Sequence, residues 1–261
     1  MIFRRALLTG AAGKLGNVLR KELPSRLDLL RSTDIVPVGE THQNEEFVAA
    51  DLGDPAAASK LVEGMDAIIH FGAIVKKDAD FAEINRVNMV GTHSLYDAAL
   101  RHGVRRVVYA SSVHAVGFYD QTEVIDARAP TRPDNYYGLS KVFGEAIAQL
   151  YWDRHGIETV SVRIGSSEET ASNHRHLKTW LSFADMVHLV ERALVTPRVG
   201  HTIIFGTSAN SASFWDNRFA AHIGYDPKDS AESFRNEILL SDPNPDLNDP
   251  VMKYQGGSWA A

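Results

Sequence analysis

Hydrophobic and polar positions alternate in a regular way through the first two thirds of the chain. Short apolar runs at residues 4–10, 27–34, 45–52, 66–72, 104–112 and 157–165 predict β-strands. Apolar residues at helical spacing predict helices between them, at 14–23, 54–64, 80–103 and 136–156. Largely apolar strands need cover on both faces, so the pattern predicts a doubly wound parallel sheet of the α/β class.

Beyond Gly165 the pattern becomes looser. A helix at 183–194 and a strand at 201–206 are still predicted, but the stretch from Ser208 onward is rich in Asn, Asp, Pro and Trp and predicts short helices and loops. We expect residues 1–165 to form the core. Residues 166–261 should form a small C-terminal part on the carboxyl edge of the sheet, with a strand and helices that pack back on the core.

Composition narrows the classes of partner. The chain has 261 residues, a net charge of −6, no basic tract and no cysteine. The charge argues against nucleic-acid binding, and the lack of cysteine excludes disulfides and Cys-ligated zinc and fits a cytoplasmic location. The apolar run before Thr9 is too short for a secretion signal, and no run is long enough to span a membrane. No metal site is expected, because His174 and His176 would diverge on a helix.

A glycine-rich turn follows the first predicted strand. Gly10, Gly13 and Gly16 would allow a tight turn, close approach of a pyrophosphate and close packing of the helix, although a simple strand-to-helix turn would also use glycine. Asp34 ends the second strand, where an acid holds the adenosine ribose of a dinucleotide and repels a 2′-phosphate. Lys14 in the turn argues mildly the other way. The sequence therefore predicts a Rossmann-type core that binds NAD rather than NADP.

The stretch "YYGLSK" places Tyr137 and Lys141 four residues apart, on one face of a predicted helix. Tyr137 lies in the first turn, so the helix dipole, the Lys141 ammonium and a nearby nicotinamide cation should all lower the pKa of the phenol. Ser112 and His114 follow a preceding strand at its carboxyl end, where ligands bind in open α/β sheets. A capping serine, a packed tyrosine and a solvated lysine are the structural alternatives.

These motifs, with Asn88 in "VNMVGT", resemble the extended short-chain dehydrogenase/reductases. The stretches "VRIGSS", "TWLSFADM", "SANSASFWDN", "GYDPKDSAE" and "YQGG" resemble the NAD-dependent uronate dehydrogenases. The resemblance implies oxidation of a cyclic hexuronate at C1 to an aldonolactone, with Tyr137 as the base, Lys141 on the nicotinamide ribose and Ser112 on the reacting oxygen. It also implies a homo-oligomer paired through the helices near 81–102 and 136–155.

The motifs and the resemblance assign roles residue by residue. The residues expected to contact the cofactor are Gly10, Gly13, Lys14, Leu15, Gly16, Asp34, Ile35, Asp51, Leu52, Phe71, Gly72, Ala73, Tyr137, Lys141 and Ser167. The residues expected to contact the substrate are Val75, Ser112, Val113, His114, Ser166 and Arg175. Arg175 should bind the C6 anion with its planar fork, although a solvated basic loop is the alternative.

Two departures from the resemblance bear on the sugar. Val75 and Val113 stand where uronate dehydrogenases have polar residues, and a sugar hydroxyl left unpaired in a buried site costs about 1–3 kcal/mol. This predicts the same reaction on a different sugar. Extra basic residues suggest sulfoquinovose, a sulfonated sugar, as one alternative; they are Lys76, Lys77, His174, His176 and Lys178.

Two other classes of protein share the expected fold. A sugar epimerase or dehydratase is disfavoured because the chain is short and its last third resembles the other group. A non-catalytic NAD-sensing protein is disfavoured because Ser112, Tyr137 and Lys141 are all present.

Overall fold

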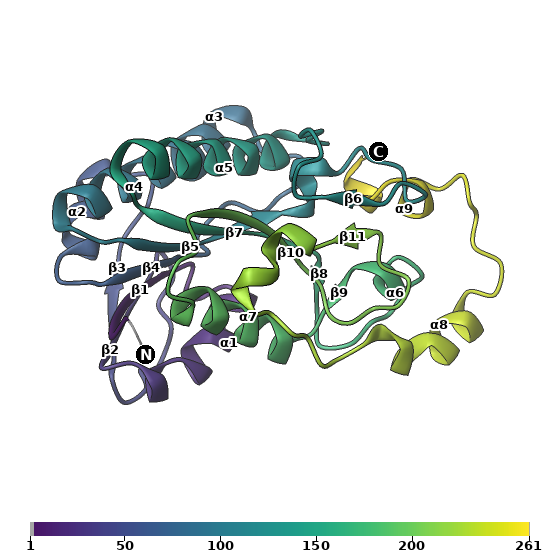
Figure 1. Cartoon of the computed structure of the whole chain (residues 1–261), viewed down its shortest axis with the longest axis horizontal. Coiled ribbons are helices and arrows are strands. Elements are labelled where there is room, and N and C mark those ends of the chain that lie inside the picture. The colour runs from purple at the N-terminus through teal and green to yellow at the C-terminus, as the bar shows by residue number, and fades with distance from the viewer. Residues whose placement is uncertain (1–2, 261) are drawn as a thin grey trace.

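The computed structural model describes residues 3–260, and a seven-stranded parallel sheet forms its centre (Figure 1). The strands lie in the order β10-β7-β5-β4-β1-β2-β3. They are β1 (Arg5–Thr9), β2 (Leu29–Asp34), β3 (Glu45–Ala49), β4 (Ala67–His70), β5 (Arg106–Ser112), β7 (Glu158–Ile164) and β10 (His201–Gly206). The order runs outward from β1 in two directions, so the carboxyl ends of β1 and β4 flank a crevice where ligands bind in such sheets.

Helices cover both faces of the sheet (Figure 1). One face packs against α1 (Lys14–Glu22) and α7 (Phe183–Val195) in a single apolar cluster. The other packs against α2 (Pro55–Val62), α4 (Gly91–His102) and α5 (Tyr136–His155) in a second cluster. All seven residues of β5, which lies between β7 and β4 inside the sheet, are buried. The predicted doubly wound α/β fold is confirmed.

The predicted helix at 80–103 is continuous but changes its winding. It begins as α3 (Phe81–Ile84), passes through a π-helical stretch (Asn85–Val90) and continues as α4 up to the left-handed Gly103. At Gly91 the helix comes so close to the chain before α2 that an added Cβ would lie 2.7 Å from the Leu52 carbonyl oxygen. The π-helical stretch carries Asn88, whose side chain contacts the loop after β4.

Short elements from both the core and the C-terminal part surround the carboxyl edge of the sheet. Two-residue strands pair as β6 (Ile125–Asp126) with β11 (Trp215–Asp216) and as β8 (Ser166–Ser167) with β9 (Trp180–Leu181). The short helices there are α6 (His176–Thr179), α8 (Arg235–Ser241) and α9 (Pro250–Lys253), with 3₁₀ turns at Val113–Val116, Arg218–Ile223, Ala231–Phe234 and Gly257–Ala260. A further 3₁₀ turn, Pro24–Arg26, follows α1. The final residues return to the core, where Gln255 and Gly256 donate backbone hydrogen bonds to Tyr119 and Gly117.

Two kinds of feature are absent from residues 3–260. None of the helices in this range is both long and apolar enough to cross a membrane. No group of three or more His, Asp or Glu side chains in the same range could hold a metal ion.

Candidate active site

One cavity of about 890 Å³ opens at the carboxyl ends of β1, β2, β4, β5 and β7. It is lined by every residue that the sequence predicted to contact cofactor or substrate, from Gly10 in the first turn to Arg175 beside α6. Residues far apart in the chain are thus brought together as expected. We call this space the site cavity.

The glycine-rich turn forms one end of the site cavity. Gly10 has a φ of 75°, and an added Cβ would lie 2.7 Å from the backbone nitrogen of Gly72. An added Cβ at Gly16 would lie 2.0 Å from the Gly10 carbonyl oxygen. The N-cap residue Gly13 provides no side-chain cap, and the first turn of α1 holds no acid. The uncapped N–H groups of α1 therefore fit the pyrophosphate of a dinucleotide.

Asp34 lies beside this turn at the end of β2. Its carboxylate accepts hydrogen bonds from the backbone N–H groups of Ala12 (3.0 Å) and Val36 (3.2 Å). Lys14, the residue that argued for NADP, instead forms an ion pair with Glu168 and donates to the Ser167 carbonyl oxygen. An acid held at this place, with the nearby lysine engaged elsewhere, fits the ribose hydroxyls of NAD.

The base candidate Tyr137 lies in the first turn of α5, as predicted. Asn135 caps the helix by accepting a hydrogen bond from the Gly138 N–H, and the Lys141 Nζ lies 5.3 Å from the centre of the Tyr137 ring. The expected lowering of the phenol pKa is wrong for the protein alone. Burial raises the pKa of Tyr137 to about 12, and although a hydrogen bond with Ser112 works in the opposite direction, nearby Asp134 adds to the rise.

Lys141 is also buried, and its charge is correspondingly costly. Burial lowers the pKa of the Lys141 ammonium to about 7. The Nζ lies 5.1 Å from the centre of the Tyr109 ring on its other side. Tyr137 is therefore packed, and it lies close to Lys141 in an enclosed place; the reactive role of the pair stays a prediction.

The two serines at the end of β5 differ in their surroundings. The Ser111 hydroxyl donates to Glu145, which also forms a buried ion pair with Arg163. The Ser112 hydroxyl accepts a backbone hydrogen bond from His114 (3.2 Å) and lies close enough to Tyr137 to lower the pKa of its phenol. Ser112 is therefore the serine that can share a hydrogen bond with a ligand at Tyr137.

A histidine and a tryptophan line the site cavity near Tyr137. The His114 Nδ1 lies 2.8 Å from a carboxylate oxygen of Asp134, whose side chain is fully buried. The ring of Trp259, from the C-terminal tail, stacks on His114 at 4.5 Å and meets Tyr137 edge-on at 5.7 Å. An Nδ1–H donated to Asp134 would leave the His114 Nε2 as a hydrogen-bond acceptor.

Arg175 lines the site cavity beside Ser166. Its Nε and Nη2 donate to the Gln255 carbonyl oxygen (2.9 and 2.6 Å), and its Nη1 donates to the Ser166 hydroxyl (2.8 Å). Burial lowers the pKa of Arg175 to about 10, so the guanidinium stays charged near neutral pH. Within residues 3–260, no acid forms an ion pair with it.

Asn88 connects two walls of the site. Its side chain accepts from the Ile74 N–H (2.8 Å) and donates to the Ile74 carbonyl oxygen (3.0 Å) and the Ser140 hydroxyl (3.1 Å). Ser140 in turn donates to the Tyr137 carbonyl oxygen. Asn88 therefore fixes the loop after β4 relative to the first turn of α5.

The five extra basic residues do not gather in the site cavity. Only Lys76 and His176 line it, and burial, with the Arg175 charge nearby, lowers the pKa of His176 to about 4. Lys77, His174 and Lys178 instead contact Ser258, Asp242 and Gln121 outside the cavity lining.

Several lining residues were missed from the sequence. Trp259 belongs to the tail, and its place beside His114 depends on tertiary packing alone. Glu168 and Arg86 also line the cavity, where Arg86 hydrogen-bonds Asp51 and, with the Gly53 N–H, lowers the pKa of that carboxyl. Glu168 directly follows Ser166 and Ser167, which were predicted to line the site. This position in the sequence was the only indication that Glu168 belongs to the site as well.

The parallel sheet, the glycine-rich turn with its acid, and the Ser–Tyr–Lys group together define a dinucleotide-dependent enzyme of the short-chain dehydrogenase/reductase type. The chain belongs to the NAD dependent epimerase/dehydratase family, whose profile matches residues 6–201. The predictions of this family, of NAD as cofactor and of an oxidoreductase are confirmed.

Relatives cover nearly the whole chain. It is 54% identical to the uronate dehydrogenase of Pseudomonas putida over 259 residues, covering 99% of this chain and 96% of that protein. It is 43% identical to the uronate dehydrogenase of Agrobacterium fabrum over 256 residues, covering 98% and 96%. The crystal structure of a uronate dehydrogenase from Agrobacterium tumefaciens matches with a TM-score of 0.96 at 43% identity, covering 100% of this chain and 97% of that one.

Proposed function

We propose that the protein oxidises a cyclic hexuronate at C1 with NAD⁺ and yields the aldonolactone. The observation that carries the proposal is that Ser112, Tyr137 and Lys141 line the same cavity as Arg175. A phenol beside an ammonium suits removal of a proton from a sugar hydroxyl, and a guanidinium suits the carboxylate at the other end of the sugar. Identities of 43–54% to uronate dehydrogenases support this class of substrate.

Arg175 has the free donors that a carboxylate needs. Of the five N–H groups of an arginine, three are used by Gln255 and Ser166, which leaves one on Nη1 and one on Nη2. These two N–H groups are at the end of the fork, where a carboxylate can accept both. The contacts that use the other three N–H groups hold the fork in place before the substrate arrives.

Tyr137 acts as the base in this proposal. Its phenol has a pKa of about 12 in the protein alone. To act as a base it must lose its proton when the site is filled, because only the phenolate can accept a proton from the sugar. Ser112 lowers this pKa by hydrogen bonding, and a protonated Lys141 lowers it by charge. The chemistry that NAD⁺ supplies when bound is acceptance of the C1 hydride. His114, oriented by Asp134, can accept a hydrogen bond from a second sugar hydroxyl.

Val75 and Val113 line the part of the site cavity where the sugar is expected to bind, and both are apolar. Val113 is buried in an apolar cluster with Val116 and Phe214, whereas Val75 is exposed at the edge of the site cavity. Neither offers a hydrogen bond to the sugar. We therefore propose that the preferred uronate has few polar contacts on this side. Sulfoquinovose stays a prediction, and most of the basic residues that suggested it lie outside the cavity lining.

The proposal is tested by following NADH formation by absorbance. Purified protein and NAD⁺ would be mixed separately with glucuronate, galacturonate, sulfoquinovose and glucose. We expect a uronate to have the highest kcat/KM and glucose the lowest. A preference for sulfoquinovose would move the substrate to the sulfonated class, and the absence of turnover with all four would overturn the proposal.

We also propose which part of the chain binds which ligand, that the protein assembles into oligomers, and where it lies in the cell. Residues 1–165 would hold NAD, and residues 166–261 would supply Ser166 and Arg175 to the sugar. The protein would form a homo-oligomer through the outer face of α4 and α5. Exposed apolar residues there include Leu139 and Leu150 on α5, with Val90 directly before α4. A cytoplasmic location, suggested by the lack of cysteine, is checked by cell fractionation.

A further inference from the structure

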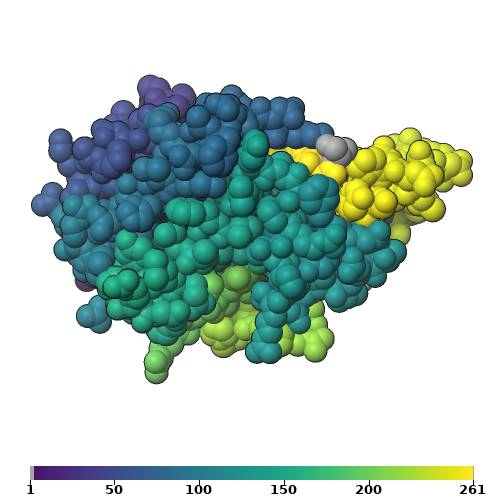
Figure 2. Space-filling view, turned by 90° about the horizontal axis from the view of Figure 1, so that it is seen from above, coloured from purple at the N-terminus to yellow at the C-terminus, as the bar shows by residue number. Residues whose placement is uncertain are grey.

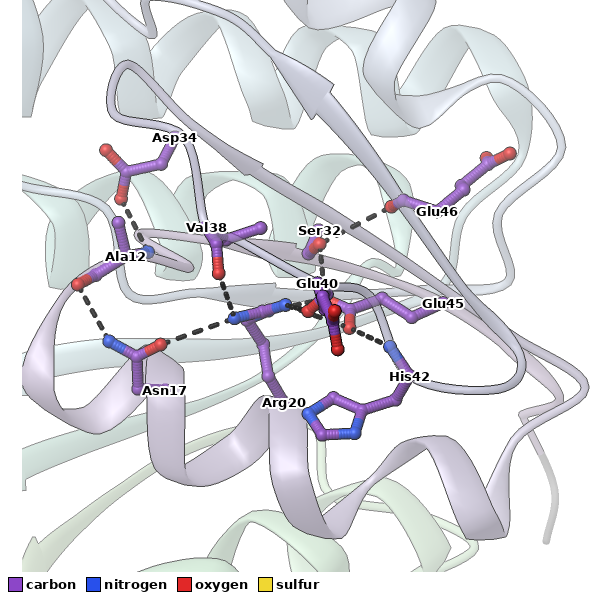
Figure 3. A network of polar contacts seen from close by, with 10 residues as sticks. All are labelled: Ala12, Asn17, Arg20, Ser32, Asp34, Val38, Glu40, His42, Glu45 and Glu46. Atoms are coloured by element: carbon purple, nitrogen blue, oxygen red, sulfur yellow. Dashed lines mark hydrogen bonds and ion pairs between the residues drawn. The ribbon is translucent and has the colours of Figure 1, made fainter.

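Figure 3 shows a buried ion pair that hydrogen bonds connect to the glycine-rich turn. Arg20, from the last turns of α1, pairs with Glu45, the first residue of β3, and the two side chains are almost completely enclosed. Neither residue lines the site cavity. Replacing a buried ion pair by apolar residues of similar volume often leaves stability unchanged. Stability alone therefore does not explain why this pair is present.

The hydrogen bonds of this pair are complete. Arg20 donates through Nε and Nη2 to Glu45, through Nη1 to Asn17 and Val38, and through Nη2 to the Glu40 carbonyl oxygen. All five of its N–H groups are thereby used. Glu45 also accepts from the Ser32 hydroxyl and the His42 N–H. Burial alone would raise the pKa of Glu45, but these hydrogen bonds hold it below its ordinary value.

One set of contacts holds the loop that follows Asp34. Residues 35–44 connect β2 to β3, and nearly all of them are exposed. Arg20 binds the carbonyl oxygens of Val38 (3.2 Å) and Glu40 (3.0 Å) in the middle of this loop (Figure 3). The loop begins with Ile35, which lines the site cavity beside Asp34.

A second set of contacts reaches the glycine-rich turn. The Arg20 Nη1 donates to the Asn17 side chain, and Asn17 donates to the Ala12 carbonyl oxygen (2.9 Å). The Ala12 N–H then donates to the Asp34 carboxylate (3.0 Å), as Figure 3 shows. Arg20 is thus connected from two directions to the acid that faces the adenosine ribose.

We propose that Arg20 and Glu45 are positioning residues that fix Asp34 and the 35–44 loop for the adenosine ribose of NAD, and so set both the affinity for NAD⁺ and the preference over NADP⁺. The inference rests on the proposed placement of NAD with its ribose at Asp34. A loop released from Arg20 lets Asp34 leave the ribose and opens room for a 2′-phosphate. The sugar end, with Arg175 and Tyr137, is untouched by this change.

The test compares Glu45→Gln with a matched control, Glu158→Gln. Glu158 forms a similar pair with the buried Arg106 and likewise accepts backbone N–H groups, from Val199 and from Gly200. The other contacts of Arg106 are with carbonyl oxygens at 193–197, so this pair has no contact with the 35–44 loop or the glycine-rich turn. Asn17→Ala is a second variant at an exposed position on α1, which removes the hydrogen bonds of Asn17 to Arg20 and to Ala12 and leaves the contacts of Arg20 with the 35–44 loop in place. The readouts are the Kd for NAD⁺ and NADP⁺ by calorimetry, the KM for uronate at saturating NAD⁺, and the melting temperature.

We expect Glu45→Gln to raise the Kd for NAD⁺ about tenfold and to lower the NAD⁺/NADP⁺ preference, with the KM for uronate unchanged. Asn17→Ala should raise the Kd in the same direction by a smaller factor. Glu158→Gln should lower the melting temperature without changing either Kd. Equal Kd values for wild type, Glu45→Gln and Asn17→Ala would overturn the inference. Failure of the wild-type protein to bind NAD⁺ would instead overturn the placement of the cofactor.

Discussion

At the residue scale, burial decides the protonation states around the site cavity. It raises the pKa of Tyr137 to about 12 and lowers that of Lys141 to about 7. The sequence predicts the opposite direction for Tyr137, because a helix dipole and a neighbouring lysine are visible in it while desolvation is not. In the proposed mechanism, the positive charge of the bound cofactor would therefore have to lower the pKa of the Tyr137 phenol.

Replacement of the phenol tests the base directly. We expect Tyr137→Phe to lower kcat by about 10²- to 10⁴-fold, because the proton acceptor is lost while the ring still packs beside Trp259. NAD⁺ binding by calorimetry should change much less than kcat. A variant with near wild-type kcat would show that another group takes the proton.

The pH dependence follows from the same pair. Because the base is the deprotonated phenol and its pKa is raised, kcat/KM should increase as the pH rises from 6 to 9. Burial lowers the pKa of the Lys141 ammonium, 5.3 Å from the ring, to about 7, so Lys141→Met should lower kcat/KM most near and below pH 7, where the wild-type side chain is charged. A profile that falls with pH, or one that Lys141→Met leaves in place, would contradict this assignment.

The proposed carboxylate anchor makes a separate prediction. Arg175→Gln should raise the KM for glucuronate about tenfold or more, because charge-assisted hydrogen bonds to the carboxylate are lost. The weak turnover of glucose should be affected much less. Lys178→Gln is the control, since Lys178 contacts Gln121 outside the cavity lining. An unchanged KM for glucuronate in Arg175→Gln would remove the anchor.

At the scale of elements, the glycine-rich turn depends on close backbone contacts. Gly10 and Gly103 have nearly the same φ, 75° and 74°, so alanine strains both backbones alike by about 1–2 kcal/mol. Only at Gly10 would the new Cβ meet another backbone, that of Gly72. We expect Gly10→Ala to abolish NAD⁺ binding by calorimetry. Gly103→Ala, at the end of α4, should lower the melting temperature and leave the binding intact, and equal NAD⁺ affinity in both variants would refute the role of the turn.

Long helices and strands were easier to predict from the sequence than short ones. The strands of the central sheet and the long helices were predicted, because apolar runs and helical spacing extend over many residues. The pairs β6–β11 and β8–β9 were not, since two residues carry no periodicity. The π-helical stretch at Asn85–Val90 was read as ordinary helix, because its winding does not disturb the apolar pattern.

The site was predicted to a similar degree. Residues in motifs, such as Gly10, Asp34 and Tyr137, all line the site cavity. Trp259 was missed because its position comes from the return of the tail to the core. The contacts of Lys77, His174 and Lys178 could not be predicted from the sequence either, because their partners lie far away in the chain.

At the scale of the whole molecule, the outer face of α4 and α5 is the surface expected to pair subunits. Figure 2 shows this side of the molecule, with the C-terminal segment projecting at one end. Leu150 on α5 is 45% exposed, and Leu139 lies three turns earlier on the same helix. Apolar side chains grouped on a helix face favour a protein contact.

Light scattering after gel filtration would test this surface. We expect a mass that is a multiple of the chain mass, and a smaller particle for Leu150→Asp. Leu240→Asp on α8 is the control, because Leu240 is 82% exposed but lies away from the face. A monomeric wild-type protein, or a change of mass in the control alone, would contradict pairing through α4 and α5.

The central claim is that this cavity transfers a hydride from C1 of a uronate to NAD⁺. The most direct measurement uses glucuronate deuterated at C1 and mass spectrometry of the reduced cofactor. The account predicts that each reduced cofactor carries one deuterium and that turnover is slower than with the unlabelled sugar. Reduced cofactor without deuterium, or none at all from a protein that binds NAD⁺, would contradict it.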